Sequence, residues 1–227
     1  MTQIYPIKLG FVASYLITSE NGIVLVDAGY PKKEKILFKF LESLNIDPIE
    51  IKLIVITHGH MDHVGSLKEI KEKTLAPVLI HESEGKLLKA GKSPEVKITI
   101  SWLAKLIKPG KSLNVNPVEP DIMINGDFPL NDYGVDGKVI CTPGHTEGSL
   151  SVIVDSKHAI VGDIAMKFPV LSRSSYVPII AESIDDVFKS WQKILNEGAE
   201  IIYPAHGKIF KADVLRELIA GRSRKLL

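Results

Sequence analysis

The segment Thr57-His58-Gly59-His60-Met61-Asp62-His63-Val64-Gly65 follows directly on an almost unbroken apolar run, Ile51–Thr57. Such a run is expected of a β-strand that is covered on both faces. Three histidines and one aspartate therefore stand together at the end of a buried strand, where a tight turn can direct several side chains into one small volume. Histidine is the commonest metal-binding side chain, and aspartate adds an anionic oxygen. The segment predicts a metal site.

The sequence before and after this segment predicts an alternation of strands and helices. In the first half, Asn21-Gly22 is a strong hairpin turn signal between two β-branched runs. The strands expected here are Ile4–Leu9, Val12–Thr18, Ile23–Asp27, Ile51–Thr57 and Pro77–Ile80. Apolar residues at helical spacing predict helices over Lys33–Leu44 and Ser66–Lys73.

The second half repeats this pattern. The strands expected there are Val139–Thr142, Leu150–Asp155, Ala159–Asp163 and Ile201–Tyr203, with helices over Asp185–Asn196 and Lys211–Ala220. Two β-rich halves, each with helices, predict an α/β fold, an αββα sandwich of two mixed sheets with helices on the outer faces. We expect one domain over residues 1–227, with an irregular helical insertion at about 82–118. A lid or dimer contact that covers the cleft is the first interpretation of its helical patch, Val96–Ile107, and core packing or docking on a membrane surface are the alternatives.

Composition and charge narrow the function classes. The 227 residues include 28 Lys and Arg and 27 Asp and Glu, which gives a net charge of +1. This balance argues against a nucleic-acid partner. The longest apolar runs are far shorter than the roughly 20 residues that span a bilayer, so no stable membrane insertion is expected. A single cysteine, Cys141, and an N-terminus without a signal-peptide pattern predict a cytoplasmic location. We expect a small-molecule substrate, and a homodimer remains open.

The stretch His58-Gly59-His60-Met61-Asp62-His63 matches the His-x-His-x-Asp-His signature of the metallo-β-lactamase superfamily, and the chain resembles this family over most of its length. Four further segments resemble the family's other motifs, in the family's order. They are Asp27-Ala28-Gly29, the Thr142–Ser149 segment, Gly162-Asp163 and Pro204-Ala205-His206-Gly207.

The resemblance implies a ligand set for two divalent metal ions. By resemblance, His58, His60 and His145 hold the first ion, Asp62, His63 and His206 hold the second, and Asp163 bridges them. Zinc is expected, with iron and manganese as alternatives, since His and carboxylate ligands suit all three. Two such ions can activate a water or hydroxide between them, and Asp62 would accept the proton. Asp27 would orient an imidazole by accepting its N–H, although a turn residue is the other interpretation of this position.

The family resemblance implies a metal-dependent hydrolase of the glyoxalase II-like or lactonase-like branch, acting on a small ester, thioester or lactone. Two departures matter. Only 21 residues follow His206, which disfavours glyoxalase II proper with its added helical domain. Met166 stands where the quorum-quenching lactonases have a tyrosine. Loop 164–182 offers Phe168, Arg173 and Tyr176 for substrate contact, and an ordinary surface loop is the alternative for each.

Two other activities remain open on the same ligands. A mononuclear-iron enzyme of the sulfur dioxygenase type would use His58, His60 and either Asp163 or His145, with an open coordination position. A phosphodiesterase or nuclease would need a basic groove, which the balanced charge does not indicate.

Overall fold

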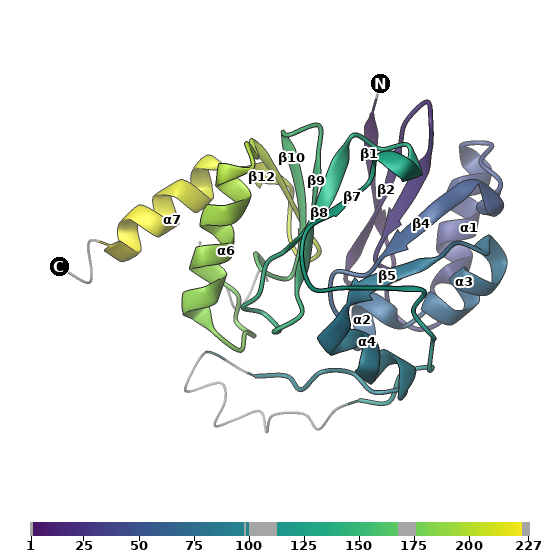
Figure 1. Ribbon diagram of the computed structural model, residues 1–227, viewed down its shortest axis with the longest axis horizontal. Coiled ribbons are helices and arrows are strands. Elements are labelled where there is room, and N and C mark those ends of the chain that lie inside the picture. The colour runs from purple at the N-terminus through teal and green to yellow at the C-terminus, as the bar shows by residue number, and fades with distance from the viewer. Residues whose placement is uncertain (1, 98, 100–112, 168–175, 224–227) are drawn as a thin grey trace.

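The computed structural model describes residues 2–97, 99, 113–167 and 176–223. It consists of two six-stranded sheets packed face to face, ordered β1-β2-β3-β4-β5-β6 and β12-β11-β10-β9-β8-β7. Helices α1 and α3 lie outside the first sheet, and α6 and α7 lie outside the second (Figure 1). The predicted fold class, an α/β sandwich of two sheets with outer helices, is confirmed.

The first sheet is built from the N-terminal half of the chain. Its strands are β1 (Gln3–Lys8), β2 (Ala13–Thr18), β3 (Ile23–Val26), β4 (Ile51–Val55), β5 (Val78–His81) and β6 (Ile122–Ile124). The first three strands are antiparallel neighbours, and β3 to β6 are parallel neighbours, so the sheet is mixed. The helices of this half are α1 (Glu34–Ser43), α2 (Met61–Val64), α3 (Leu67–Thr74) and α4 (Glu82–Lys89), with a 3₁₀ turn at Pro48–Glu50.

The second sheet is built from the C-terminal half. Its strands are β7 (Phe128–Pro129), β8 (Gly137–Cys141), β9 (Leu150–Val154), β10 (His158–Gly162), β11 (Ile201–Pro204) and β12 (Phe210–Lys211). Neighbouring strands are antiparallel except β10 and β11, which are parallel. Helices α6 (Ile184–Asn196) and α7 (Asp213–Ser223) follow, and a 3₁₀ turn spans Asn131–Tyr133.

Apolar side chains fill three layers, and alternation along the strands distributes them. On β3, Val24 and Val26 point between the two sheets, whereas Leu25 points toward the outer helices. The outer layer of the first sheet packs against Leu37 and Leu41 of α1. The outer layer of the second sheet packs against α6, whose residues there include Val187, Trp191 and Ile194. Strands buried on both faces explain the nearly continuous apolar runs in the sequence.

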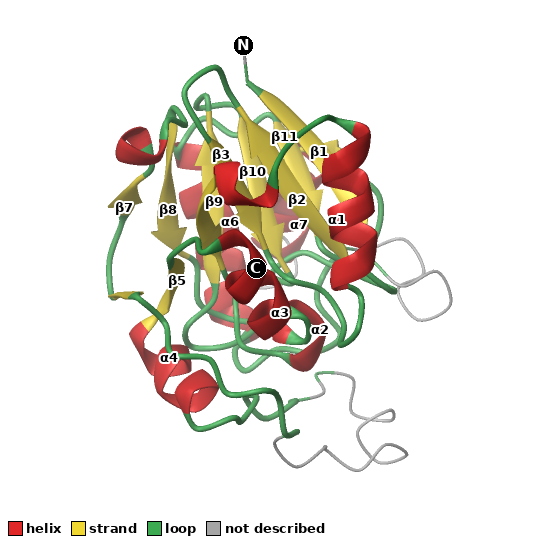
Figure 2. Ribbon diagram, turned by 90° about the vertical axis from the view of Figure 1, so that its right-hand side faces the viewer, coloured by secondary structure: helices red, strands yellow, loops and turns green. Residues whose placement is uncertain are grey.

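The topology brings several strand ends to one edge. Because β3 and β4 are parallel, as are β10 and β11, their carboxyl ends point the same way within each sheet. Strand β8 is separated from β10 by one antiparallel neighbour and so ends at the same edge as β10. Helices α2 and α4 lie beyond this end of the strands in both views (Figure 2). The carboxyl ends of strands in α/β sheets are where ligands commonly bind.

The segment predicted as a helical insertion begins with a helix that the sequence pattern does not identify. Residues 82–89 form helix α4. Its buried face contains Glu84, Gly85 and Leu88, so it lacks the apolar periodicity that reveals a helix in sequence. Most of the expected 96–107 helix lies outside the described residues. Within the described ranges, the structure contains no helix with the length and apolar character needed to cross a membrane.

Candidate metal centre

The His-rich turn after β4 contributes four of the side chains predicted to bind metal. His58 lies in the extended segment between β4 and α2, and His60 is the residue that precedes the first turn of α2. Asp62 and His63 lie within that short helix. The other three come from the ends of β8, β10 and β11. The structure therefore brings all seven predicted residues to one edge of the sandwich, in two adjoining groups.

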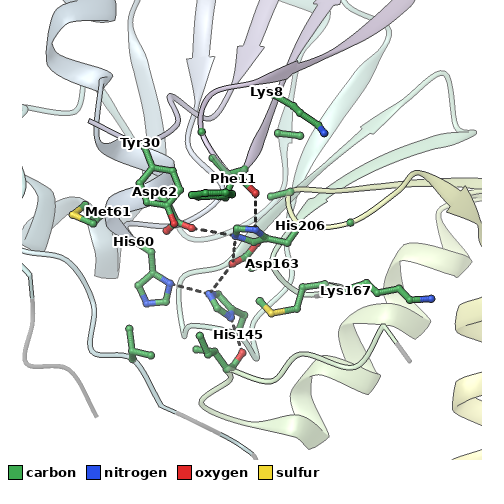
Figure 3. A pocket seen from close by; sticks show the side chains of 18 of the residues that line it. Lys8, Phe11, Tyr30, His60, Met61, Asp62, His145, Asp163, Lys167 and His206 are labelled. Carbon is green, nitrogen blue, oxygen red and sulfur yellow. Dashed lines mark hydrogen bonds and ion pairs between the residues drawn. The ribbon is translucent and has the colours of Figure 1, made fainter. Parts of the chain in front are cut away.

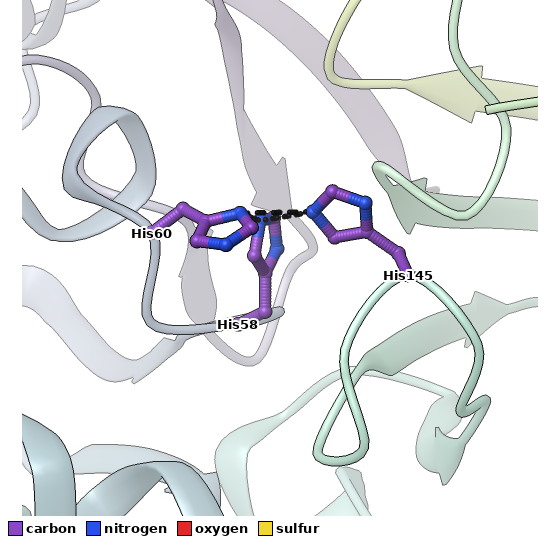
Figure 4. A group of neighbouring side chains, drawn as sticks. All are labelled: His58, His60 and His145. Atoms are coloured by element: carbon purple, nitrogen blue, oxygen red, sulfur yellow. Dashed lines mark hydrogen bonds between the residues drawn. The ribbon is translucent and has the colours of Figure 1, made fainter. Parts of the chain in front are cut away.

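The first group consists of three buried histidines, His58, His60 and His145 (Figure 4). Nε2 of His58 lies 3.1 Å from Nδ1 of His60 and 3.1 Å from Nε2 of His145. Nδ1 of His60 lies 2.9 Å from Nε2 of His145. The three nitrogens form a nearly equilateral triangle, although their residues are up to 87 positions apart in sequence.

The second group consists of Asp62, His63, Asp163 and His206. His206 Nε2 lies 3.1 Å from Asp62 Oδ2 and 3.5 Å from Asp163 Oδ2. His63 Nε2 lies 3.5 Å from Asp163 Oδ1. Figure 3 shows the side chains of Asp62, Asp163 and His206 pointing toward one another beside His60 and His145.

Asp163 lies between the two groups. Its Oδ2 is 3.9 Å from His58 Nε2 and 3.7 Å from His145 Nε2, both in the first group. Its two oxygens face His63 and His206 in the second group at 3.5 Å. The preceding residue, Gly162, has φ +52°, and a Cβ there would lie 2.7 Å from Thr57 Oγ1. Only glycine fits this close approach to Thr57 without strain, and this turn directs Asp163 between the groups.

The outer nitrogens of three of these imidazoles, on His63, His145 and His206, have fixed partners. His63 Nδ1 lies 2.8 Å from Asp27 Oδ2, and His145 Nδ1 lies 2.8 Å from the carbonyl oxygen of Ile180. His206 Nδ1 lies 3.2 Å from the carbonyl oxygen of Phe11. A partner that accepts from Nδ1–H places the proton there and leaves Nε2 as a lone-pair donor toward the site.

Asp27 is itself held by hydrogen bonds from Thr57, which follows β4. It has φ +64°, and its carboxylate accepts hydrogen bonds from the backbone N–H and the hydroxyl of Thr57 at 2.8 Å each. Asp27 therefore connects the end of β4 to the ring of His63, and both side chains are almost completely buried.

The surroundings favour ligand-like protonation states for His58, His145 and Asp163, whereas facing carboxylates, against the effect of burial, raise the pKa of His63 and of His206. Burial lowers the pKa of His58 and of His145, which favours neutral imidazoles. For Asp163, burial opposes ionisation, but the facing His206 and His63 hold its pKa below the usual value. Metal ligands must present neutral imidazole and ionised carboxylate.

The donor set and its spacing fit divalent cations. Three nitrogens bound tetrahedrally to one zinc at about 2.0–2.1 Å lie about 3.3 Å apart, close to the spacing of the first group. Buried His60 Nε2, His63 Nε2 and Asp163 Oδ1 lack a hydrogen-bond partner among the described residues. Unsatisfied buried polar atoms are rare, and a cation on the second group would satisfy His63 and Asp163. The cluster is a site for divalent metal ions.

A pocket of about 820 Å³ opens beside the cluster, with His60, Asp62, His145, Asp163 and His206 in its wall. Its apolar lining includes Phe11, Val96, Leu113, Met166 and Ile180. Three lysines, Lys8, Lys167 and Lys208, also line it. Figure 3 shows Lys8 and Lys167 on the His206 side, with their ammonium ends directed away from His60.

Of the three residues predicted to contact substrate in loop 164–182, the structure describes only Tyr176. Phe168 and Arg173 lie outside the described residues. Tyr176 is buried, stacks on Phe210 with ring centroids 3.7 Å apart, and donates to the Lys208 carbonyl at 3.3 Å. It is not among the residues that line the pocket, so its contact with substrate stays a prediction. Phe11 and Tyr30 also line the pocket, and the sequence does not identify them because neither belongs to a motif.

Known proteins resemble this chain in sequence and in fold. The profile of the metallo-beta-lactamase superfamily matches residues 7–206. The probable metallo-hydrolase MJ0888 of Methanocaldococcus jannaschii is 32% identical over 197 residues, 86% of this chain and 87% of that protein. A hydroxyacylglutathione hydrolase of Pelagibacter ubique is 36% identical over 139 residues, but these are only 60% of this chain and 44% of that protein.

Among solved structures, the metallo-beta-lactamase family protein TTHA1429 from Thermus thermophilus superposes with a TM-score of 0.70 at 20% identity, over 99% of this chain and 80% of that one. At this identity the likeness shows the fold alone. Together the matches are consistent with the predicted class, a metal-dependent hydrolase, and support the glyoxalase II-like branch only weakly. The matched residues span all five motifs from Asp27 to His206, and the chain belongs to the metallo-β-lactamase superfamily.

Proposed function

We propose that this chain is a hydrolase that cleaves a small ester, thioester or lactone with two divalent cations held by the seven clustered residues. The observation that carries the proposal is the assembly of two ligand groups around Asp163 in the wall of one pocket. The three histidines His58, His60 and His145 would hold one ion. Asp62, His63 and His206 would hold the other, and Asp163 would contact both.

Cations bound there would lower the pKa of a water molecule and polarise a substrate carbonyl. Asp62 is the residue best placed to take up the proton that this water loses. Its side chain is 20% exposed, whereas His206 and Asp163 are each 5% exposed. Asp62 lines the pocket, so substrate and water can reach its carboxylate.

The wall of the pocket favours a substrate with an apolar part and a negative charge. Phe11 is 90% exposed at the pocket and offers an apolar surface to a ligand. Lys8, Lys167 and Lys208 supply positive charge, and within the described parts of the chain no carboxylate forms an ion pair with any of them. The name of the Pelagibacter relative, a hydroxyacylglutathione hydrolase, places thioesters first among the substrates to test.

The test is the metal content of protein purified without added metal, measured beside a panel of thioesters, lactones and esters with and without a carboxylate. We expect about two zinc or manganese ions per chain and turnover of an anionic member of the panel. About one iron per chain with oxygen uptake and no hydrolysis would overturn the proposal in favour of the iron dioxygenase. Metal binding without turnover of any panel member would overturn the substrate class.

A further inference from the structure

Glu84 is a buried acidic residue that no motif includes. It lies in the first turn of α4, next to the metal centre, and only 2% of its surface is exposed. No cationic side chain pairs with it in the described surroundings, and burial raises its pKa to about 7. Burying a carboxyl group without a cationic partner costs free energy, so we asked which contacts compensate for it.

The Glu84 carboxyl contacts two loops that carry metal-binding histidines. One oxygen, Oε2, accepts a hydrogen bond from the backbone N–H of Gly59, the residue between His58 and His60. The other, Oε1, accepts from the hydroxyl of Thr146, the residue after His145. These partners are 25 and 62 positions from Glu84 in sequence.

The backbone comes close to Glu84 at two glycines. A Cβ at Gly59 would lie 3.0 Å from Oε2 of Glu84, and one at Gly148 would lie 2.5 Å from its Cγ. The Gly148 N–H is a further donor to the carboxyl group. Thr146 is fixed in turn by Ser149, whose hydroxyl lies 2.9 Å from the Thr146 hydroxyl and accepts from its N–H at 3.0 Å.

We propose that Glu84 is a positioning residue that joins the 58–60 turn to the 145–149 loop and so holds three imidazoles in the arrangement that binds the first metal ion. The inference rests on the proposed metal centre and adds a residue that does not contact the ion. The triangle of His58, His60 and His145 spans these two loops, and its nitrogens lie within 3.1 Å of one another. Glu84 contacts both loops through a backbone N–H and a hydroxyl, and so leaves those nitrogens free for the ion.

The second group provides the internal comparison. Its members His63 and His206 have their own partners, the carboxylate of Asp27 and the carbonyl of Phe11, and neither partner contacts Glu84. A residue that positions only the first group should affect only the ion bound there. Replacing a residue that merely supports the fold should weaken the binding of both ions and lower the melting temperature of the metal-free protein in proportion.

The experiment measures Zn²⁺ affinity by chelator competition in two backgrounds. His206→Ala retains all three residues of the first group, and His145→Ala retains all four residues of the second. In His206→Ala, Glu84→Ala should weaken Zn²⁺ binding about 10–100-fold, as loss of a residue supporting a ligand does. In His145→Ala the same change should alter affinity by less than about twofold. Equal weakening in both backgrounds, or none in the first, would overturn the inference.

A second variant and a spectroscopic readout test the inference even if Glu84→Ala folds poorly. Glu84→Gln has nearly the same shape but keeps only one acceptor oxygen, so it cannot accept from both Gly59 and Thr146. In the otherwise unchanged chain it should alter the visible absorption of one of two bound Co²⁺ ions, whereas Glu69→Gln on α3 should leave both spectra unchanged. Identical spectra for Glu84→Gln and the parent chain would also overturn the inference. A parent chain that binds no metal would instead refute the proposed function.

Discussion

The Asp27 carboxylate and the His63 imidazole lie 2.8 Å apart, from Oδ2 to Nδ1, and both side chains are at most 3% exposed. This contact fixes the face of His63 that is turned to the second ligand group. Asp27→Asn retains the shape and tolerates the positive φ of Asp27, but a neutral amide holds the imidazole N–H less strongly. We expect metal affinity at one site to fall about 10–100-fold, measured by chelator competition.

The matched control for this change is Asp155→Asn. Asp155 also has a positive φ, +52°, but lies exposed in the turn between β9 and β10, away from the ligand groups. Its replacement should leave metal affinity unchanged. If both variants bind metal as the parent chain does, Asp27 has no role in orienting His63.

Asp62→Ala should abolish hydrolysis and leave the fold largely intact. It removes a ligand and the proposed proton acceptor from a partly exposed position in the pocket wall. Loss of a general base alone costs about 10²–10⁴-fold in rate. Turnover is measured on the best panel substrate and the fold by thermal melting, with the exposed Asp136→Ala as control. Turnover like that of the parent chain would refute the mechanism.

Asp163→Ala should lower the number of bound metal ions, because Asp163 lies within 3.9 Å of nitrogens from both groups. We expect a fall from about two ions per chain to one or fewer, measured by elemental analysis after desalting. An unchanged metal content would show that Asp163 does not bridge the two sites.

The sequence predicts the ligands well for a physical reason. Five of the seven lie in the segment that follows a strand, and Asp62 and His63 lie in the short helix α2 that continues one of these segments, so the strand pattern and the motif together determine where each lies. Strands β3, β4, β10 and β11 are buried on both faces, and their apolar runs identify them without ambiguity. The outer helices α1 and α6 are equally clear from their apolar periodicity.

The sequence does not predict the residues that support the ligands. Glu84 gives no signal, because its partners Gly59 and Thr146 become neighbours only when the two sheets pack together. The same buried carboxyl group disrupts the apolar face of α4 and hides that helix. Tyr176, predicted as a substrate contact from its loop between two ligand motifs, lies against Phe210, a packing that depends on tertiary structure.

Gly162→Ala should destabilise the fold and disturb the metal site together. A side chain at φ +52° and contact with Thr57 at 2.7 Å together cost roughly 2–4 kcal/mol. We expect a fall of several degrees in Tm and weaker metal binding, since Gly162 precedes Asp163. Gly126→Ala is the control, because a Cβ there has no atom within 4 Å. Equal melting temperatures for the two variants would contradict this account.

The stability of the metal-free protein should depend on pH because of Glu84. Burial, with the charge of nearby Glu182, raises the folded-state pKa of Glu84 from 4.5 to about 7. The hydrogen bonds from Thr146 and Gly59 lower this pKa, but their effect is smaller. The folded state therefore binds more protons than the unfolded state between these values, and stability falls as pH rises through this window. We compare the free energies of unfolding of the parent chain and of Glu84→Gln. The difference, parent minus variant, should fall by roughly 3 kcal/mol between pH 4.5 and 8. Urea denaturation of both proteins at each pH measures this difference, and parallel curves would show that Glu84 is ionised at the same pH in both states.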